Sequence, residues 1–89
     1  MPQAIVDPEE LRQFARSLKK FNAELRDRAG AISNKLNSLG TTWRDQEHKK
    51  FVQQFEEHMK ALSRFTEVSD RHVPYLMRKA EQIDEYLQS

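Results

Sequence analysis

The feature that most constrains the fold is a regular spacing of apolar residues between residues 11 and 39. They recur in steps of three, four or seven, at Leu11, Phe14, Leu18, Phe21, Leu25, Ile32, Leu36 and Leu39. This spacing is typical of one face of an α-helix, because a half-buried strand would alternate with a period of two. Arg28 interrupts the stripe, and Gly30 beside it marks either a close approach of helices or a weak point in the helix. The pattern predicts one long amphipathic helix.

Local signals place this helix at about residues 8–39. Asp7 is suited to be the N-cap, with Pro8 at the first helical position and Glu10 three residues after the cap, as in a capping box. Gly40 is suited to the position after the C-cap, where helices commonly end. At 1.5 Å per residue such a helix is roughly 48 Å long. The first half of the chain therefore predicts an elongated rod.

A second helix is expected at about residues 43–87, after a turn at about 40–42. Thr42 and Asp45 have the spacing of another capping box, and so short a connection makes the two helices antiparallel. The apolar residues of this helix fall in two adjoining rows. One row is Phe51, Phe55, Leu62, Phe65 and Leu76, and the other is Val52, Met59, Val73 and Met77. A stripe this wide indicates that the second helix packs against more than the first.

Pro74 lies inside the expected second helix. A proline there removes one backbone hydrogen bond and clashes with the preceding turn, so it kinks or breaks a helix. The apolar pattern keeps its register on both sides of Pro74, at Ser69, Leu76 and Ile83, which are seven residues apart. A kinked but continuous helix is the preferred interpretation, and a break is the alternative.

The predicted fold is an all-α, single-domain hairpin over residues 1–89 that dimerises into an elongated four-helix bundle. A lone hairpin buries too little apolar surface to offset its conformational entropy, whereas two hairpins side by side bury both rows. The partner is either a second copy or a related hairpin chain. The residues expected in the core of this dimer or bundle are Leu11, Phe14, Leu18, Phe21, Leu25, Ile32, Leu36, Phe51, Phe55, Met59, Leu62, Phe65 and Leu76.

Composition and motifs favour a protein that is not an enzyme. The formal net charge is +1 although a third of the residues are charged, so no basic surface for nucleic acid is expected. The three histidines are better explained by packing or interface roles than by metal binding, and no cofactor motif is present. No run of apolar residues is long enough to span a bilayer, and the absence of a charged-then-apolar pattern before the first helix means that a cleaved signal peptide is not expected. We expect a cytoplasmic protein, with export without a cleaved signal peptide as the alternative.

A hairpin of about 90 residues with a tryptophan at its turn resembles the WXG100 (ESAT-6-like) superfamily. Trp43 takes the position of the family tryptophan, Leu39 precedes the turn, and Phe51 stands eight residues after Trp43. The resemblance implies a dimeric four-helix bundle, no enzymatic activity, and export by a type VII (ESX-like) secretion system. Gly40, Trp43 and Asp45 are the residues of the expected turn or recognition motif.

The sequence departs from that family at two points. The tripeptide reads Trp43-Arg44-Asp45, so an aspartate replaces the glycine of the W-x-G motif. The family export signal, a tyrosine followed four residues later by an acidic residue, is also missing, because Lys79 follows Tyr75 at that spacing.

Two functions remain open. One is a secreted factor or adaptor of a type VII-like system, and the other is an intracellular helical scaffold or partner-chain adaptor that is not exported. Trp43 is interpreted either as a lid over Leu36 and Leu39 alone, or as a lid that secretion machinery also recognises.

Overall fold

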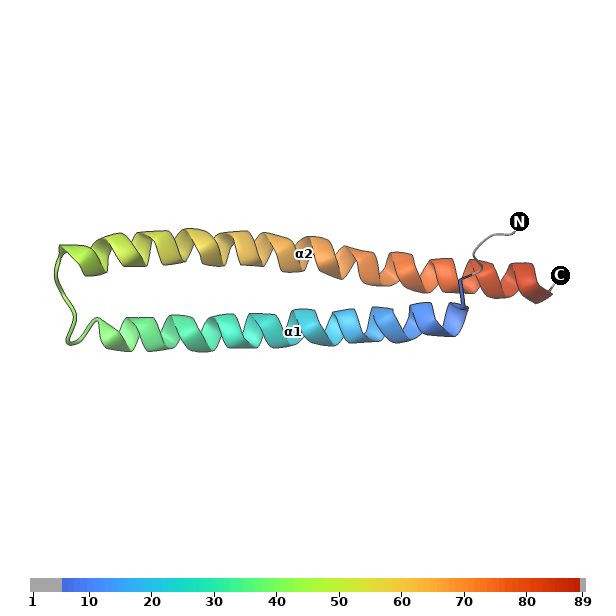
Figure 1. Cartoon of the computed structure of the whole chain (residues 1–89), viewed down its shortest axis with the longest axis horizontal. Helices are drawn as coiled ribbons and strands as arrows, with labels where there is room; N and C mark the ends of the chain where they lie inside the picture. Colours follow the sequence, from blue (N-terminus) through green and yellow to red (C-terminus); the bar gives the residue numbers. More distant parts are fainter. Residues whose placement is uncertain (1–5, 89) are drawn as a thin grey trace.

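Two long antiparallel helices form the described part of the chain, residues 6–88 of a computed structural model (Figure 1). Helix α1 spans Pro8–Leu39, and helix α2 spans Gln46–Gln88. The hairpin is a rod with principal extents of 67 × 21 × 17 Å. Because α2 has 43 residues and α1 has 32, the end of α2 extends past the start of α1 (Figure 1). The predicted all-α, elongated, antiparallel hairpin is confirmed.

The start of α1 is held by its N-cap. The Asp7 side chain accepts a hydrogen bond from the backbone N–H of Glu9 at 2.9 Å, and Pro8 occupies the first turn. This bond goes to Glu9 and not to Glu10, the position that a capping box requires. Glu9 also forms ion pairs with Arg12 at 3.5 Å and with Arg16 at 3.1 Å. A cap and two acidic residues in the first turn complement the helix dipole.

The turn is longer than predicted, because α2 begins at Gln46 and not at about 43. Thr42 does not cap α2: its hydroxyl donates to the carbonyl oxygen of Leu39, at the end of α1. Asp45 is the residue that caps α2, since its carboxylate accepts from the backbone N–H of His48 at 3.0 Å. Thr42 and Asp45 therefore serve different helix ends. A hydroxyl can donate to the free carbonyl groups at the end of α1, whereas a carboxylate accepts from the free N–H groups at the start of α2.

The two glycines have different surroundings. Gly40 is in the right-handed helical conformation, so a left-handed cap does not explain it. A Cβ atom at Gly40 would lie only 3.2 Å from the Asn37 carbonyl oxygen, whereas its distance of 3.6 Å from the His48 ring would be an ordinary contact, so the glycine relieves crowding against the end of α1. A Cβ atom at Gly30 would meet nothing within 4 Å, which excludes the close helix approach considered for it.

Helix α2 runs through Pro74 without a break. The residues on both sides of the proline remain helical, and α2 stays alongside α1 there (Figure 1). The half-buried Val73 and Leu76 flank Pro74, and α2 continues beyond it to Gln88. Packing on α1 thus compensates for the lost backbone hydrogen bond.

Small and polar side chains fill the seam between the helices. The side chains that are fully or almost fully buried are Ala15 and Asn22 of α1 and Thr66, Ser69 and Ala80 of α2. Such residues let the helices approach closely, but they bury little apolar area. The Nδ2 of Asn22 donates to Oδ1 of Asp70 at 2.9 Å, which joins the helices near their middle. The seam alone therefore supplies only a small part of a normal hydrophobic core.

Candidate interaction site

One side of the hairpin carries most of its large apolar side chains, and we call it the apolar face. From α1 it includes Phe14, Leu18, Leu25 and Ile32, together with Phe21 two helical turns after Phe14, and from α2 it includes Leu62, Phe65 and Leu76. Phe14 is 57% exposed, Phe21 50% and Phe65 51%. Scattered exposed apolar residues are normal, whereas a continuous face of them marks an interaction surface.

Two grooves cross the apolar face where the helices meet. Towards the open end, Phe14 and Leu18 of α1 face Phe65 and Leu76 of α2 across a groove of about 380 Å³. His72 also lines this groove. Such a shape suits an inserted side chain of another helix better than a small molecule, because each groove is open along the rod.

The second groove lies towards the turn and has a volume of about 400 Å³. Leu25, Ile32 and Leu62 supply its apolar walls, and Arg28 and Lys35 border it. Among the described residues, neither Arg28 nor Lys35 forms an ion pair. The apolar face is thus aromatic at one end and carries free cations nearer the turn.

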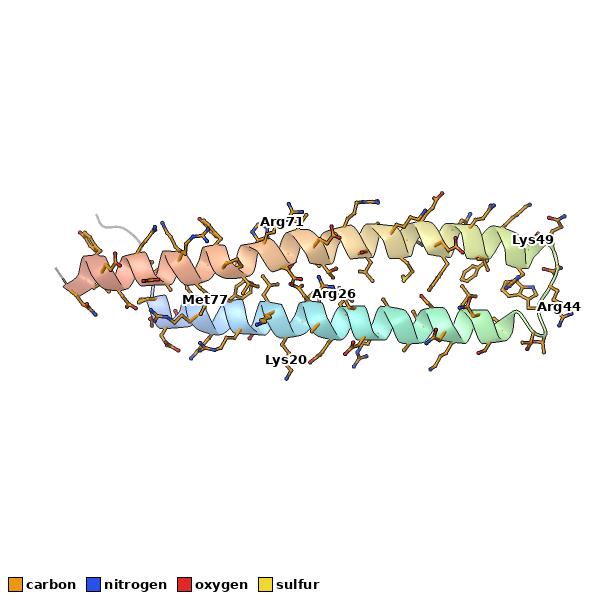
Figure 2. The ribbon with its side chains drawn as sticks, turned by 180° about the vertical axis from the view of Figure 1, so that it is seen from behind. Lys20, Arg26, Arg44, Lys49, Arg71 and Met77 are labelled. Atoms are coloured by element: carbon orange, nitrogen blue, oxygen red, sulfur yellow. The ribbon has the colours of Figure 1, made fainter. Side chains whose placement is uncertain are left out.

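The opposite side of the hairpin is charged and its ion pairs cross between the helices. Arg12 pairs with Asp84, and Arg26 pairs with Asp70. Figure 2 shows Arg26 directed towards α2, whereas Lys20 points away from it. The hydrogen bond with Asp84 raises the pKa of Arg12. Hydrogen bonds from Arg26 and then from Asn22 lower the pKa of Asp70. On this side two ion pairs join the helices, in contrast to the apolar face.

The turn carries a cluster of aromatic rings. The Trp43 ring lies edge-on to His48 with a centroid distance of 4.9 Å, and 6.0 Å from the Phe51 ring, which stacks in turn on Phe55. The Trp43 backbone N–H donates to the Leu39 carbonyl oxygen at 2.9 Å. Trp43 is partly exposed, so it joins the end of α1 to the start of α2 and still presents an edge to solvent. Arg44 lies beside it at the tip of the turn (Figure 2).

The predicted core residues fall into two groups in a single chain. Five are exposed, namely Phe14, Phe21, Ile32, Phe51 and Phe65. The others are half-buried, namely Leu11, Leu18, Leu25, Leu36, Phe55, Met59, Leu62 and Leu76. None is fully buried within the hairpin, so a core made from them requires a second chain.

The sequence interpretation missed two polar residues of the seam. Asn22 and Thr66 are buried, and an apolar stripe does not reveal them, whereas Ser69 was placed on the inward register with Leu76. A signal was available, because Ala15, Asn22 and Ala29 recur every seven residues in α1. Repeated small residues at a heptad position indicate a close helix contact as clearly as leucines do.

The described residues show no cluster that could bind a metal ion. Between residues 6 and 88, no three side chains among histidines and carboxylates come close enough together to hold a metal ion. His58 is exposed, and His48 packs on Trp43. Within the same residues, neither helix has a stretch both long and apolar enough to cross a membrane.

The family model for WXG100, described as proteins of 100 residues with WXG, matches residues 3–86. The chain belongs to the WXG100 family. Two-helix hairpins of this family typically dimerise into four-helix bundles. A comparison of its sequence with curated proteins gives no significant match.

Solved structures share the fold of this WXG100 protein. The secreted protein EsxB from Bacillus anthracis has a TM-score of 0.79 and 22% identity, with 97% of this chain and 98% of that chain covered. A second structure of the wild-type EsxB from the same organism has a TM-score of 0.78 and 23% identity, with 94% of this chain and 97% of that chain covered. Because each match covers nearly all of both chains, it supports the two-helix hairpin as the fold of the matched residues.

Proposed function

We propose that this WXG100 protein acts through protein–protein contact, as a secreted factor or adaptor of a type VII (ESX-like) secretion system. The observation that carries the proposal is the apolar face, which covers one side of the hairpin and is left open by the single chain. Family membership and the likeness to the secreted EsxB support the link to secretion. The chemistry is binding, since the apolar face offers mainly large apolar side chains.

The functional unit in this proposal is a dimer. Exposed Phe14 and Phe65, on different helices, line the same groove and would be buried together by one partner. Burial of a phenylalanine side chain stabilises by about 1.5–3 kcal/mol, so several such residues outweigh the cost of association. A second hairpin of similar length matches the length of the face.

Trp43 and Asp45 form the recognition end in this proposal. Asp45 stands two residues after Trp43, where the family motif has its glycine, and it caps α2 through His48. Glycine is also an acceptable N-cap, so the replacement keeps the local backbone geometry that the motif needs. The exposed edge of Trp43 is then available to secretion machinery.

An intracellular scaffold that is not exported is the second candidate function. The observation that favours it is Lys79, which stands where the family export signal has an acidic residue after Tyr75. Export as a passenger on a related chain that carries the signal would reconcile this feature with secretion.

Secretion is tested by measuring the native protein in the culture medium and in the cell pellet, with the secretion ATPase intact or deleted. The proposal expects protein in the medium only when the ATPase is present. Protein confined to the pellet of a strain with a working system would contradict secretion and favour the scaffold.

A Trp43→Ala variant separates recognition from packing. Loss of the ring contacts with His48 and Phe51 is expected to lower the free energy of unfolding by about 1–2 kcal/mol, because Trp43 is only partly buried. Recognition further predicts that export is lost while dimer mass is unchanged. Trp43→Phe keeps an aromatic ring as the matched control. Wild-type export of folded W43A would show that Trp43 is a lid only.

A further inference from the structure

Trp43 is attached to the hairpin through its backbone, but its ring is oriented by neighbouring side chains. The backbone N–H donates to the Leu39 carbonyl oxygen at 2.9 Å, which fixes the main chain at this point of the turn. This bond does not choose among the staggered rotamers of the tryptophan side chain. The direction of the half-buried ring, and of the edge that it shows to solvent, therefore depends on what the ring touches.

Two rings lie beside Trp43, and the protein holds them to different degrees. The Phe51 ring belongs to a residue that is 44% exposed, and its centroid lies 6.0 Å from that of Trp43. The His48 ring is closer, at 4.9 Å, and meets Trp43 edge-on, which is an arrangement that aromatic pairs favour. His48 is also half-buried. Of the two neighbours, His48 is therefore the firmer support for the tryptophan ring.

The position of His48 is itself fixed from two sides. Its backbone N–H donates to the Asp45 carboxylate at 3.0 Å, at the start of α2. Its ring lies against the end of α1, because Cε1 and Nε2 are 3.6 and 3.7 Å from the place that a Cβ atom of Gly40 would occupy. The His48 ring thus connects the end of α1 with the ring of Trp43.

Packing, rather than a hydrogen bond through Nε2, holds the ring of His48 in this place. The Nε2 atom is buried and has no hydrogen-bond partner among the described residues. A buried nitrogen without a partner does not add to stability, because its lost hydration is not replaced. The planar shape of the ring is then the property that supports Trp43.

We propose that His48 is a positioning residue for Trp43, and that its ring sets the direction in which the exposed edge of the tryptophan meets a partner. Asp45, which stands where the family motif has its glycine, contributes by fixing the backbone of His48. A glycine has no side chain that could do so, and Asp45 and His48 therefore act together in this chain. The inference rests on the recognition role proposed above for Trp43 and adds the residue that orients it.

The test uses fluorescence, because the chain contains a single tryptophan and its emission reports on Trp43 alone. His48→Leu keeps an apolar side chain but removes the planar ring, so it is expected to increase the quenching of this emission by acrylamide. Export into the medium is expected to fall about 2- to 10-fold, the factor by which one aromatic pair changes the population of the held ring. Dimer mass and helicity should stay as in the wild type.

Two further variants isolate the ring. His48→Phe keeps a planar ring and removes the unpaired nitrogen, so wild-type quenching and wild-type export are expected. Gln53→Leu is the matched control, since Gln53 is an exposed residue of the same helix. Equal quenching and equal export in H48L and Q53L would overturn the positioning role. An H48F protein that loses as much as H48L would overturn it as well.

The contribution of Asp45 is tested by Asp45→Ala in two backgrounds. In the wild type, loss of the cap is expected to increase the quenching of Trp43. In the H48L background the same substitution is expected to add nothing, because residue 48 no longer orients the ring. Equal increases in both backgrounds would contradict an action of Asp45 through His48.

The quenching measurement does not require export, so it separates this inference from the proposed function. Wild-type export of W43A together with increased quenching in H48L would overturn recognition through Trp43 and support the hold of His48 on its ring. Loss of export in W43A together with unchanged quenching and export in H48L would leave recognition standing and overturn the positioning role.

Discussion

The seam between the helices and the apolar face of the hairpin differ in a way that is unusual for a folded protein. The seam is closed but holds small and polar residues, among them Ala15, Asn22 and Thr66. The apolar face is open but holds phenylalanine and leucine residues, such as Phe14 and Phe65. The hairpin thus places its best core-forming residues on the outside. The difference indicates that the seam fixes the register of the two helices, and that the face supplies the stability once a second chain covers it.

A charge introduced on the apolar face is expected to reduce dimer formation and stability the most. Leu25→Asp places a carboxylate on the apolar face, where a partner would desolvate it, so we expect loss of the dimer and a fall in the free energy of unfolding of about 3 kcal/mol or more. Sedimentation equilibrium and thermal melts by circular dichroism measure both quantities.

Ala23→Asp is the control for this variant. Ala23 is exposed on the opposite side, in a groove with Lys19, Arg26 and Asp70, where we expect the two cations to offset an added carboxylate. Equal losses for L25D and A23D would show that the apolar face has no special role.

A larger side chain in the seam is expected to lower the stability of the hairpin by an intermediate amount. Ala80 is fully buried against α1, so Ala80→Leu forces the helices apart and costs about 1–3 kcal/mol. Ala23→Leu, on an exposed position, should change the melting temperature little. A stable A80L protein with an unchanged melt would show that the seam is loosely packed and does not fix the register.

Removing the buried amide is expected to have a smaller effect. Asn22→Ala deletes the hydrogen bond to Asp70, which contributes about 1 kcal/mol, although the better helix propensity of alanine offsets part of the loss. The exposed Asn34→Ala gains the propensity without losing the bond, so it should be slightly more stable than the wild type. Denaturant melts that place N22A at or above N34A would mean that the amide does not stabilise the seam.

The pH dependence of stability that arises from Asp70 is expected to be the smallest of these effects. Arg26 and Asn22 lower its pKa below the ordinary value of 3.8. The carboxylate therefore stabilises the fold above about pH 4, and this contribution is lost as the pH falls through the lowered pKa. Melts between pH 2 and pH 6 should show this loss in the wild type and a weaker dependence in Asp70→Asn. Identical pH profiles would contradict a stabilising role for the ion pair.

Much of the fold could be predicted from the sequence because its signals are local. The heptad spacing of α1 and the cap at Asp7 depend only on neighbouring residues. The start of α2 was mispredicted because Thr42 and Asp45 are both good N-caps, and only the course of the turn decides between them. Asn22 was missed because its partner, Asp70, is 48 residues away in sequence. The apolar stripe of α1 is readable in the sequence, but only the grooves show that it shares a face with apolar residues of α2.

The most direct test of the account is the mass of the purified protein by sedimentation equilibrium at micromolar concentration, together with its helicity. One chain has a mass of 10.6 kDa. The account predicts a helical species of twice that mass, whose helicity falls as dilution dissociates it. A stable, fully helical monomer of 10.6 kDa over the same concentrations would contradict the claim that the apolar face needs a second chain.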